Sequence, residues 1–167
     1  MIEAELDHSD SNSLFQIISE IVHSAESEKH GCTLVIDLNE EPLDISGQKL
    51  SDPMDLRQPE FLELAKSLAK LDGALHIRID MKLHGFASLL DGRAIRGEDR
   101  SRGARFNSAL RFTDEHDDIF VVVVSSDRPV SIIKAGIELS AQCHWNPLSS
   151  IISLPPTLEE WIQRQSV

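Results

Sequence analysis

Arginine side chains are concentrated in one stretch of the chain, residues 93–111. Six of the ten arginines lie there against three acidic residues between 91 and 111, so this stretch is positive in a chain of net charge −12. A guanidinium group has paired donors that match the oxygens of a phosphate group. The stretch is therefore a candidate phosphate-binding loop, and the alternative is a solvated loop whose arginines offset surrounding acids. The six are Arg93, Arg96, Arg100, Arg102, Arg105 and Arg111.

Glycines in the same stretch favour the first interpretation. Gly92, Gly97 and Gly103 would let backbone N–H groups come close to a ligand. A short helix is predicted to open at about Ala104, and the N-terminus of a helix attracts anions. The loop and the helix together could hold a phosphorylated ligand.

Two further segments carry side chains that could do chemistry. Asp72 and Gly73 lie where a predicted helix meets a predicted strand, and a carboxylate there could bind a divalent metal or take a proton from a hydroxyl group. Asp-Gly is also a common turn dipeptide, so a plain turn is the alternative. Ser125 follows a buried strand, where polar residues often face a ligand crevice or simply end the strand.

The elements that must position these residues follow from the spacing of apolar side chains. A helix is predicted over 13–28, with a capping box formed by Ser13 and Gln16. Further helices are predicted from Pro59, over 105–112, over 137–143 and over 158–165. Strands are predicted over 33–38, 43–45, 74–81, 86–90, 119–124 and 129–134. The strand over 74–81 alternates apolar and polar residues, so it should be half-buried, with its turn at 82–85.

This order predicts an α/β fold with a single domain, in which a mixed β-sheet is flanked by helices. We divide the chain into a flexible N-terminus (1–10), the main domain (11–135) and a C-terminal helical extension packed on it (136–167). The seven histidines form no metal-binding motif, and His76 and His84 are expected to pair on the surface of a hairpin.

Composition excludes several classes of partner. A chain of 167 residues with 28 acidic and 16 basic residues is repelled by nucleic-acid backbones, so general nucleic-acid binding is not expected. Anionic membrane surfaces are disfavoured for the same reason. Cys32 and Cys143 give no disulfide framework or zinc pattern and are expected to be reduced. With no signal-peptide pattern or long apolar run, a cytoplasmic location is expected.

Three motifs, in order, resemble the diadenylate cyclase (DAC) domain family, to which the nucleotide-binding domain of DisA belongs. Asp72-Gly73-Ala74 is similar to the family's Asp-Gly-Ala motif, and Gly103-Ala104-Arg105-Phe106-Asn107 occupies the place of its Gly-Thr-Arg-His-Arg motif. Val124-Ser125-Ser126-Asp127 resembles its Val-Ser-Glu-Glu turn. The likeness extends over roughly residues 30–135.

The resemblance implies a DAC-like fold and a reaction in which two ATP molecules condense to cyclic di-AMP and pyrophosphate. It implies that two domains meet face to face in a homo-oligomer and that Mg²⁺ or Mn²⁺ is required. Asp72 would bind the metal and activate a ribose hydroxyl, and Arg105 would hold phosphate at the reacting centre. The nucleotide-binding residues implied are Gly73, Ala74, Leu89, Gly103, Ala104, Arg105, Phe106, Asn107 and Ser125.

The chain departs from the family pattern at three positions. Ala104 replaces a threonine, Phe106 a histidine and Asn107 an arginine. Arg100, Arg102 or Arg111 could supply the missing charge, and Phe106 could fill the core or pack against a base. The departures leave a second function open, a catalytically degenerate sensor or regulatory module that binds ATP or another nucleotide on the same fold.

Overall fold

Strand β1 (Cys32–Asp37) lies in the middle of the sheet, where all six of its residues are buried, and five of them are apolar or β-branched. It pairs in parallel with β3 (Ala74–Arg78) and antiparallel with β5 (Ile119–Val124). The computed structural model describes residues 8–139. The predicted mixed sheet is confirmed, as are the strand at β1 and the strand over 119–124.

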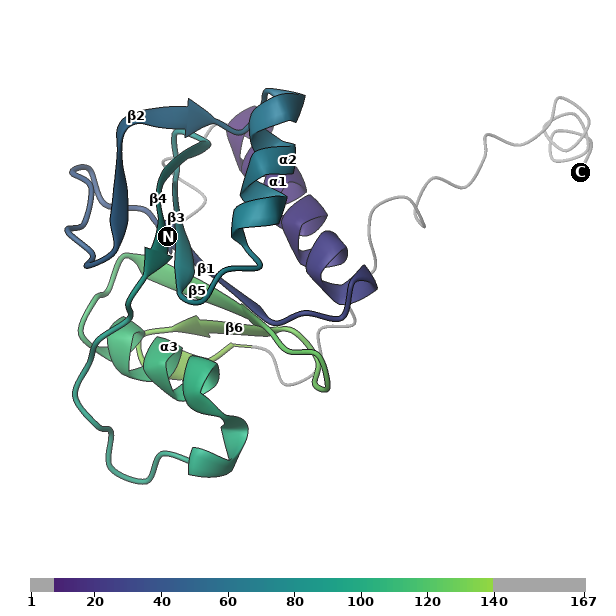
Figure 1. Cartoon of the computed structure of the whole chain (residues 1–167). Coiled ribbons are helices and arrows are strands. Elements are labelled where there is room, and N and C mark those ends of the chain that lie inside the picture. The colour runs from purple at the N-terminus through teal and green to yellow at the C-terminus, as the bar shows by residue number, and fades with distance from the viewer. Residues whose placement is uncertain (1–7, 140–167) are drawn as a thin grey trace, which may run out of the picture.

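Within the described residues the sheet has seven strands, in the order β2-β4-β3-β1-β5-β6-β7. Figure 1 shows their arrangement. Apart from the parallel pair β1–β3, all of its neighbouring strands are antiparallel. The remaining strands are β2 (Gln48–Asp55), β4 (Lys82–Ser88), β6 (Ser131–Lys134) and β7 (Ile137–Glu138).

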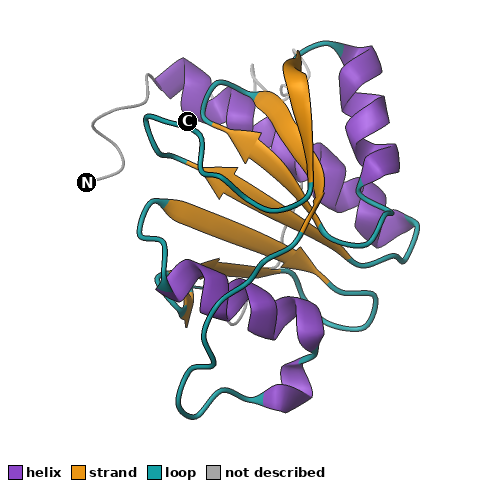
Figure 2. Ribbon diagram, turned by 60° about the vertical axis from the view of Figure 1, so that its left-hand side comes forward, coloured by secondary structure: helices purple, strands orange, loops and turns teal. Residues whose placement is uncertain are grey.

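Helices cover both faces of this sheet, as the ribbon views show (Figures 1 and 2). Helices α1 (His8–Ser27) and α2 (Pro59–Leu68) pack on one face, and α3 (Ala104–Asp114) packs on the other. The first core lies between the sheet and helices α1 and α2, and the second core lies between the sheet and α3. Because side chains alternate along a strand, Leu34 and Ile36 contribute to the first core and Val35 to the second. Thr33, Asp37 and the polar residues of β3 therefore face the side of the sheet on which α3 lies.

Helix α1 begins earlier than predicted, so the capping box at Ser13 is wrong. The helix starts at His8 and Ser13 lies inside it. The apolar stripe, which begins at the buried Leu14, marks where the helix meets the sheet and not where it starts. The predicted start of α2 at Pro59 is confirmed, because proline is accepted in the first helical turn.

The predicted strand over 43–45 is wrong, since this segment is a loop and the strand is β2, farther along the chain. Leu43 and Ile45 are apolar because they pack on the second core. Strand β2 is an edge strand in which no residue is buried, so no apolar run marks it. The hairpin turn also comes before 82–85, because β4 already starts at Lys82 and Met81 takes the left-handed conformation that the turn needs (φ 60°).

Strand β3 is buried on both faces instead of half-buried. Leu75 and Ile77 pack in the core under α1 and α2, and on the other face His76 and Arg78 bind Asp37 and the loop that follows β1. At the C-terminal end, Ile137 and Glu138 form β7 and not the predicted helix, because they pair with the neighbouring strand β6. The sheet thus continues past residue 135. The predicted helix over 158–165 lies outside the described residues, as do residues 1–7 and the rest of the proposed extension from 140.

Cys32 is a free cysteine and is buried, and burial raises the pKa of its thiol to about 12. Cys143 lies beyond the described part of the chain. Within residues 8–139, no helix has the length and apolar content needed to span a bilayer.

Candidate functional site

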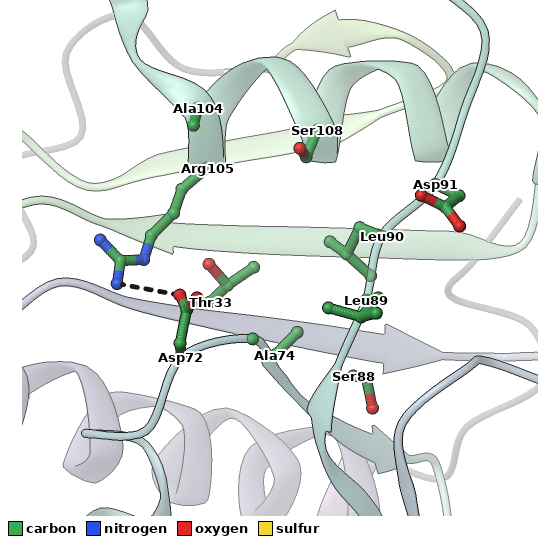
Figure 3. A pocket seen from close by; sticks show the side chains of 11 residues that line it. Thr33, Asp72, Ala74, Ser88, Leu89, Leu90, Asp91, Ala104, Arg105 and Ser108 are labelled. Atoms are coloured by element: carbon green, nitrogen blue, oxygen red, sulfur yellow. Dashed lines mark ion pairs between the residues drawn. The ribbon is translucent and has the colours of Figure 1, made fainter.

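A cavity of about 300 Å³ lies between the sheet, the segment that follows β4 and the N-terminal turn of α3 (Figure 3). Strands β1 and β3 form its floor, and Leu89 and Leu90 form an apolar wall. It brings together six of the predicted site residues from segments far apart in sequence. Its lining comprises Thr33, Asp72, Gly73, Ala74, Ser88, Leu89, Leu90, Asp91, Ala104, Arg105 and Ser108.

Asp72 and Arg105 face each other at the mouth of this cavity, as predicted for a carboxylate and a phosphate-binding arginine (Figure 3). Arg105 Nη2 lies 3.7 Å from Asp72 Oδ1. The Asp72 side chain is fully exposed and that of Arg105 is 48% exposed, so this ion pair contributes little to stability. Both groups are therefore free to turn toward a ligand at little cost to the fold.

Gly73 allows the chain to pass close to β4 at the edge of the cavity. Its φ is +102°, and a Cβ added there would lie 2.5 Å from the carbonyl carbon of Ala87. Glycine tolerates both the left-handed backbone and the close approach, and other residues do not. The close approach to β4 therefore requires glycine at position 73, and an ordinary turn would not.

We expect Gly73→Ala to lower the free energy of unfolding by about 1–3 kcal/mol, from backbone strain and the contact with Ala87. Gly97→Ala is the matched control, because Gly97 also has a positive φ (+87°) but no atom within 4 Å of the added Cβ. Urea denaturation of both variants separates the cost of backbone strain from the cost of the contact with Ala87. Equal losses in the two variants would show that the close approach at Gly73 carries no cost.

The N-terminus of α3 opens on the ligand side. Gly103 is its N-cap, with φ +91°, and no side chain caps the helix. A second hollow of about 180 Å³ adjoins this end and shares Ala104 and Arg105 with the larger cavity. It is lined by Gly31, Gly103, Ala104, Arg105, Val123, Val124, Ser125 and Ser126. Free backbone N–H groups at a helix start, next to an arginine, suit an anionic group.

Ser125 lies in this smaller hollow and not in the larger cavity. Its hydroxyl donates to Asp127 Oδ1 at 2.7 Å, and its oxygen can still accept a hydrogen bond. Gly103 lies there too. The sequence-predicted residues are thus divided between two adjoining spaces, with Ala104 and Arg105 between them.

Phe106 and Asn107 point away from both spaces. Phe106 is buried in the core between α3 and the sheet, which confirms the core alternative for this residue. The Asn107 amide donates to the carbonyl of Asp99 at 3.2 Å. Neither side chain lines a ligand cavity, although the sequence motif places both in the predicted site.

The three other arginines considered for phosphate binding are held elsewhere. Arg102 stacks 3.9 Å above the Phe106 ring and pairs with Glu138 at 2.8 Å. Arg111 forms a bidentate pair with Glu98, with its Nε 2.7 Å from Glu98 Oε2. Arg100 is exposed and near the same carboxylate. None of these three lines either space, so we leave them out of the proposed site.

Sequence reasoning missed the hydroxyl groups of the cavity. Thr33, Ala74 and Ser88 stand side by side across β1, β3 and β4, because the register pairs Ala74 with both of the others. Ser108 and Asp91 complete the polar lining. Thr33 and Ser88 lie at opposite ends of this row and far apart in sequence. Only the strand register reveals them.

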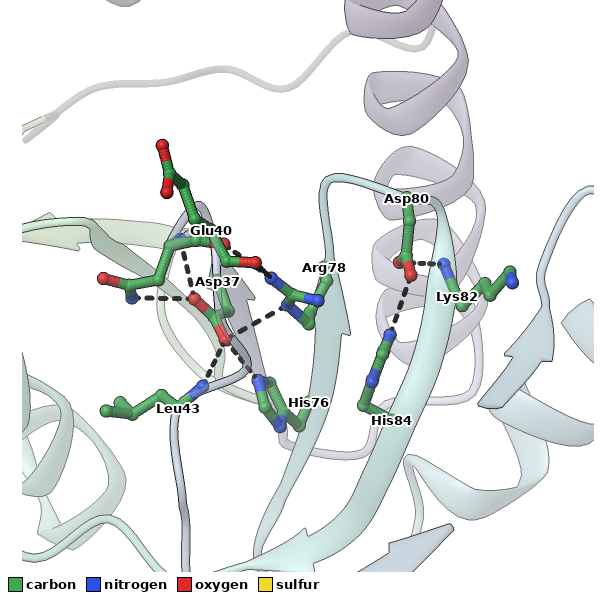
Figure 4. A network of polar contacts seen from close by, with 9 residues as sticks. Asp37, Glu40, Leu43, His76, Arg78, Asp80, Lys82 and His84 are labelled. Atoms are coloured by element: carbon green, nitrogen blue, oxygen red, sulfur yellow. Dashed lines mark hydrogen bonds and ion pairs between the residues drawn. The ribbon is translucent and has the colours of Figure 1, made fainter. Parts of the chain in front are cut away.

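A buried polar network lies deeper on the same face of the sheet (Figure 4). Asp37 is fully buried, and its Oδ2 accepts from His76 Nε2 at 2.9 Å and from the Leu43 amide at 2.9 Å. Arg78 Nε lies 3.5 Å from the same oxygen, and Arg78 Nη2 donates to the Glu40 carbonyl. The polar residues of β3 were expected on a solvated face and instead make the network that holds the 39–43 loop.

Burial alone would raise the pKa of the Asp37 carboxyl. The hydrogen bonds from His76, Leu43 and Asn39 outweigh it and hold the pKa well below its usual range. The loop that this carboxylate anchors leads to Ser46, whose carbonyl accepts from the Leu89 amide at 2.7 Å. The network therefore fixes, through this loop, a wall of the cavity.

His76 and His84 do approach each other, with ring centroids 5.9 Å apart, but His76 is buried instead of on the surface. Both line a separate hollow of about 260 Å³ that meets the larger cavity at Ser88. His84 Nε2 lies 3.0 Å from Asp80 Oδ2. Each imidazole is thus paired with a carboxylate, that of Asp37 in β1 for His76 and that of Asp80 in the β3–β4 turn for His84.

Comparisons with known proteins agree with this arrangement. No curated protein matches the chain. Two solved structures resemble it in fold. A crystal structure of DacA from Staphylococcus aureus, in a double-mutant form, is 21% identical with a TM-score of 0.57, covering 78% of this chain and 87% of that one. The hypothetical membrane spanning protein from Bacillus cereus is 20% identical with a TM-score of 0.55, covering 73% of this chain. The matched region spans only 60% of the latter's length.

A family model provides the sequence-level evidence. The model for the DisA bacterial checkpoint controller nucleotide-binding domain matches residues 19–138, which is most of the chain. The match runs from within α1 to β7 and includes every residue that lines the two spaces at the start of α3. The chain therefore belongs to the DAC family, the family of the DisA nucleotide-binding domain.

Proposed function

We propose that this domain binds ATP in the 300 Å³ cavity and condenses two ATP molecules to cyclic di-AMP. The observation that carries the proposal is the pairing of Asp72 and Arg105 at 3.7 Å on the rim of that cavity, beside the uncapped start of α3. A carboxylate, an arginine and a helix N-terminus are the groups that phosphoryl transfer uses for positioning and charge neutralisation.

The cavity has two chemically different ends, and these orient the nucleotide. Leu89 and Leu90 make the apolar end, which suits the base. Arg105 and the N-terminus of α3 make the phosphate end, and the adjoining hollow with Ser125 takes the outer phosphates. The ribose then lies over the sheet between the two ends, near Asp72.

The reaction assigns a role to each of these groups. The ribose 3′-oxygen of one ATP attacks the α-phosphorus of the other, and its proton passes to the Asp72 carboxylate. The new bond joins this oxygen to phosphorus, and the bond to the β-phosphate oxygen breaks, so pyrophosphate leaves with the electron pair. Arg105 neutralises charge on the α-phosphate. A second transfer in the opposite sense closes the ring.

A divalent metal fits this donor set only with help from the ligand. Among residues 8–139, no three His, Cys, Asp or Glu side chains are close enough to form a metal site alone. Mg²⁺ is commonly held by one or two carboxylates together with substrate phosphates. Asp72 would hold Mg²⁺ or Mn²⁺ in this way, with Asp91 the other carboxylate that lines the cavity. The metal would supply charge neutralisation at the phosphates.

One cavity holds one nucleotide, so the condensation needs two copies of the chain. We propose a homodimer in which the mouths of two cavities face each other. The exposed Asp72 side chain and the 59% exposed Leu89 lie at that mouth, where a facing copy would cover them. The same surface would bring each 3′-oxygen to the α-phosphate of the opposing ATP.

Binding of ATP is tested by replacing Arg105. We expect Arg105→Gln to weaken ATP binding by roughly 10- to 100-fold, because a charged hydrogen bond to phosphate is lost. Arg57→Gln is the control, since Arg57 also forms an exposed ion pair, with Asp55 on the far edge of the sheet. Isothermal titration with ATP and Mg²⁺ measures both. Unchanged affinity in Arg105→Gln would remove this residue from the proposed site.

A second candidate function has its own support. Of the five-residue motif at the start of α3, only Gly103, Ala104 and Arg105 line the ligand spaces, and one arginine remains where the family pattern has two. This favours a nucleotide-binding sensor or regulatory module without turnover. ATP that stabilises the protein without being consumed would identify it.

A further inference from the structure

Thr33 places a hydroxyl group on the floor of the cavity. It is the second residue of β1, and the strand register sets it opposite Ala74 of β3 and Val123 of β5. The residue is 5% exposed and lines the cavity. Figure 3 shows Thr33 and Asp72 among the side chains that line this cavity.

This hydroxyl has no hydrogen-bond partner among the described residues. The neighbouring polar groups at that end, Asp72 and Arg105, pair with each other. The buried side-chain atoms without a partner in the described part of the chain are His30 Nε2, Arg78 Nε and Asn107 Oδ1, so the Thr33 oxygen is not sealed in the core. It opens on the cavity, where an unpaired hydroxyl is available to a ligand. Because Thr33 is β-branched and lies in a central strand, its side chain is held in place and does not move to find a partner.

We propose that Thr33 binds the ribose 2′-hydroxyl and so selects ribonucleotides over 2′-deoxyribonucleotides. The inference rests on the proposed function, since it concerns the same cavity. With the base at Leu89 and Leu90 and the phosphates at α3, the sugar lies over the part of the floor where Thr33 stands. Asp72 approaches the 3′-hydroxyl, and the 2′-hydroxyl is the adjacent group on the same ring.

The alternative polar contacts are less suited to the sugar. Ser88 lies at the other end of the row, beyond Ala74, and also borders the hollow that contains the histidines. The Leu89 amide already donates to the Ser46 carbonyl. Thr33 is thus the floor hydroxyl that lines this cavity without also bordering the hollow with the histidines, and it can both donate to and accept from a sugar hydroxyl.

The test compares the affinities of ATP, 2′-deoxyATP and 3′-deoxyATP, with Mg²⁺, for the full chain and for Thr33→Val and Thr33→Ser. The unmodified protein is expected to bind ATP about 10-fold more tightly than 2′-deoxyATP. Thr33→Val keeps the shape of the side chain and removes the hydroxyl, so this ratio should fall to about 1. Thr33→Ser restores the hydroxyl and should restore most of the ratio.

The ratio of the affinities for ATP and 3′-deoxyATP serves as the internal control. This ratio depends on Asp72 and should not change in Thr33→Val. A Thr33→Val protein that keeps its preference for ATP over 2′-deoxyATP would overturn the inference while leaving ATP binding established. An unmodified protein that binds none of the three nucleotides would overturn the proposed function itself. Thermal melts of the variants, together with Thr33→Ser, separate loss of folding from loss of selectivity.

Discussion

Asp72→Asn is expected to reduce the rate of cyclic di-AMP formation by at least about 10²-fold, while the affinity for ATP changes far less. Asparagine keeps the size of the side chain but cannot accept the proton of the 3′-hydroxyl and binds a divalent metal poorly. Because the Asp72 side chain is fully exposed and its pair with Arg105 contributes little to the fold, the variant should remain folded. Single-turnover assays with Mn²⁺, followed by chromatography, measure the rate.

Asp52→Asn is the matched control for this variant, because Asp52 is exposed on the edge strand β2, away from the cavity. Its rate should equal that of the unmodified protein. Full activity of Asp72→Asn, or activity that persists after removal of divalent metal, would contradict the role given to Asp72.

Asp37→Asn is expected to have the largest effect on stability, lowering the free energy of unfolding at pH 7 by about 3–5 kcal/mol. The substitution removes the fully buried carboxylate that faces His76 and Arg78, and so leaves a buried guanidinium without its counter-charge. It also replaces one of the two acceptor oxygens that bind the 39–43 loop with an NH2 donor, and this loop fixes the Leu89 wall through Ser46. ATP affinity should fall together with stability.

The cost of Asp37→Asn should depend on pH in a defined direction. The folded state lowers the pKa of Asp37, so its stabilisation is fully present above the unfolded pKa, about 3.9, and is lost as the pH falls toward the folded value. The difference in unfolding free energy between the two proteins should therefore be constant from about pH 5 to 7 and shrink below about pH 4. Urea titrations at several pH values measure it.

Asp55→Asn provides the comparison for the stability experiment. The hydrogen bond from Arg57 is the main cause that lowers the pKa of Asp55, to about 2, but this pair lies at the surface. Its loss should cost less than about 1 kcal/mol. A cost for Asp37→Asn no larger than that for Asp55→Asn would contradict the anchoring role of the buried network.

Helices and strands whose own residues mark them could be predicted from the sequence. Strands β1 and β5 are apolar runs that stay buried wherever they are placed, and Pro59 marks a helix start by itself. Strand β2 has no such signal, because an edge strand is defined by the strand it pairs with. The turn before β4 was misplaced because Met81 adopts a left-handed conformation that methionine rarely favours.

The residues of the candidate site also differ in whether the sequence alone could predict them. Asp72, Gly73 and Arg105 were predictable because motifs mark them, and the structure brings them to one cavity. Thr33 and Ser88 were not, since they come together only through strand register. The motif also led to the prediction that Phe106 and Asn107 bind the nucleotide, although neither lines a ligand space. Phe106 lies on the face of α3 that packs on the sheet, and Asn107 is buried against the carbonyl of Asp99, whereas Arg105 and Ser108 lie on the face toward the cavity.

The central claim is that this domain condenses ATP, and the most direct test is to incubate the purified protein with ATP and Mn²⁺ or Mg²⁺ and identify the products by mass spectrometry. We predict cyclic di-AMP and pyrophosphate in a ratio of one to two, as the balanced reaction requires, with the formation of both slowed by at least about 10²-fold in Asp72→Asn. Stabilisation by ATP without any product would assign the domain to the sensor function instead. The absence of both product and ATP-induced stabilisation would contradict the proposed function as a whole.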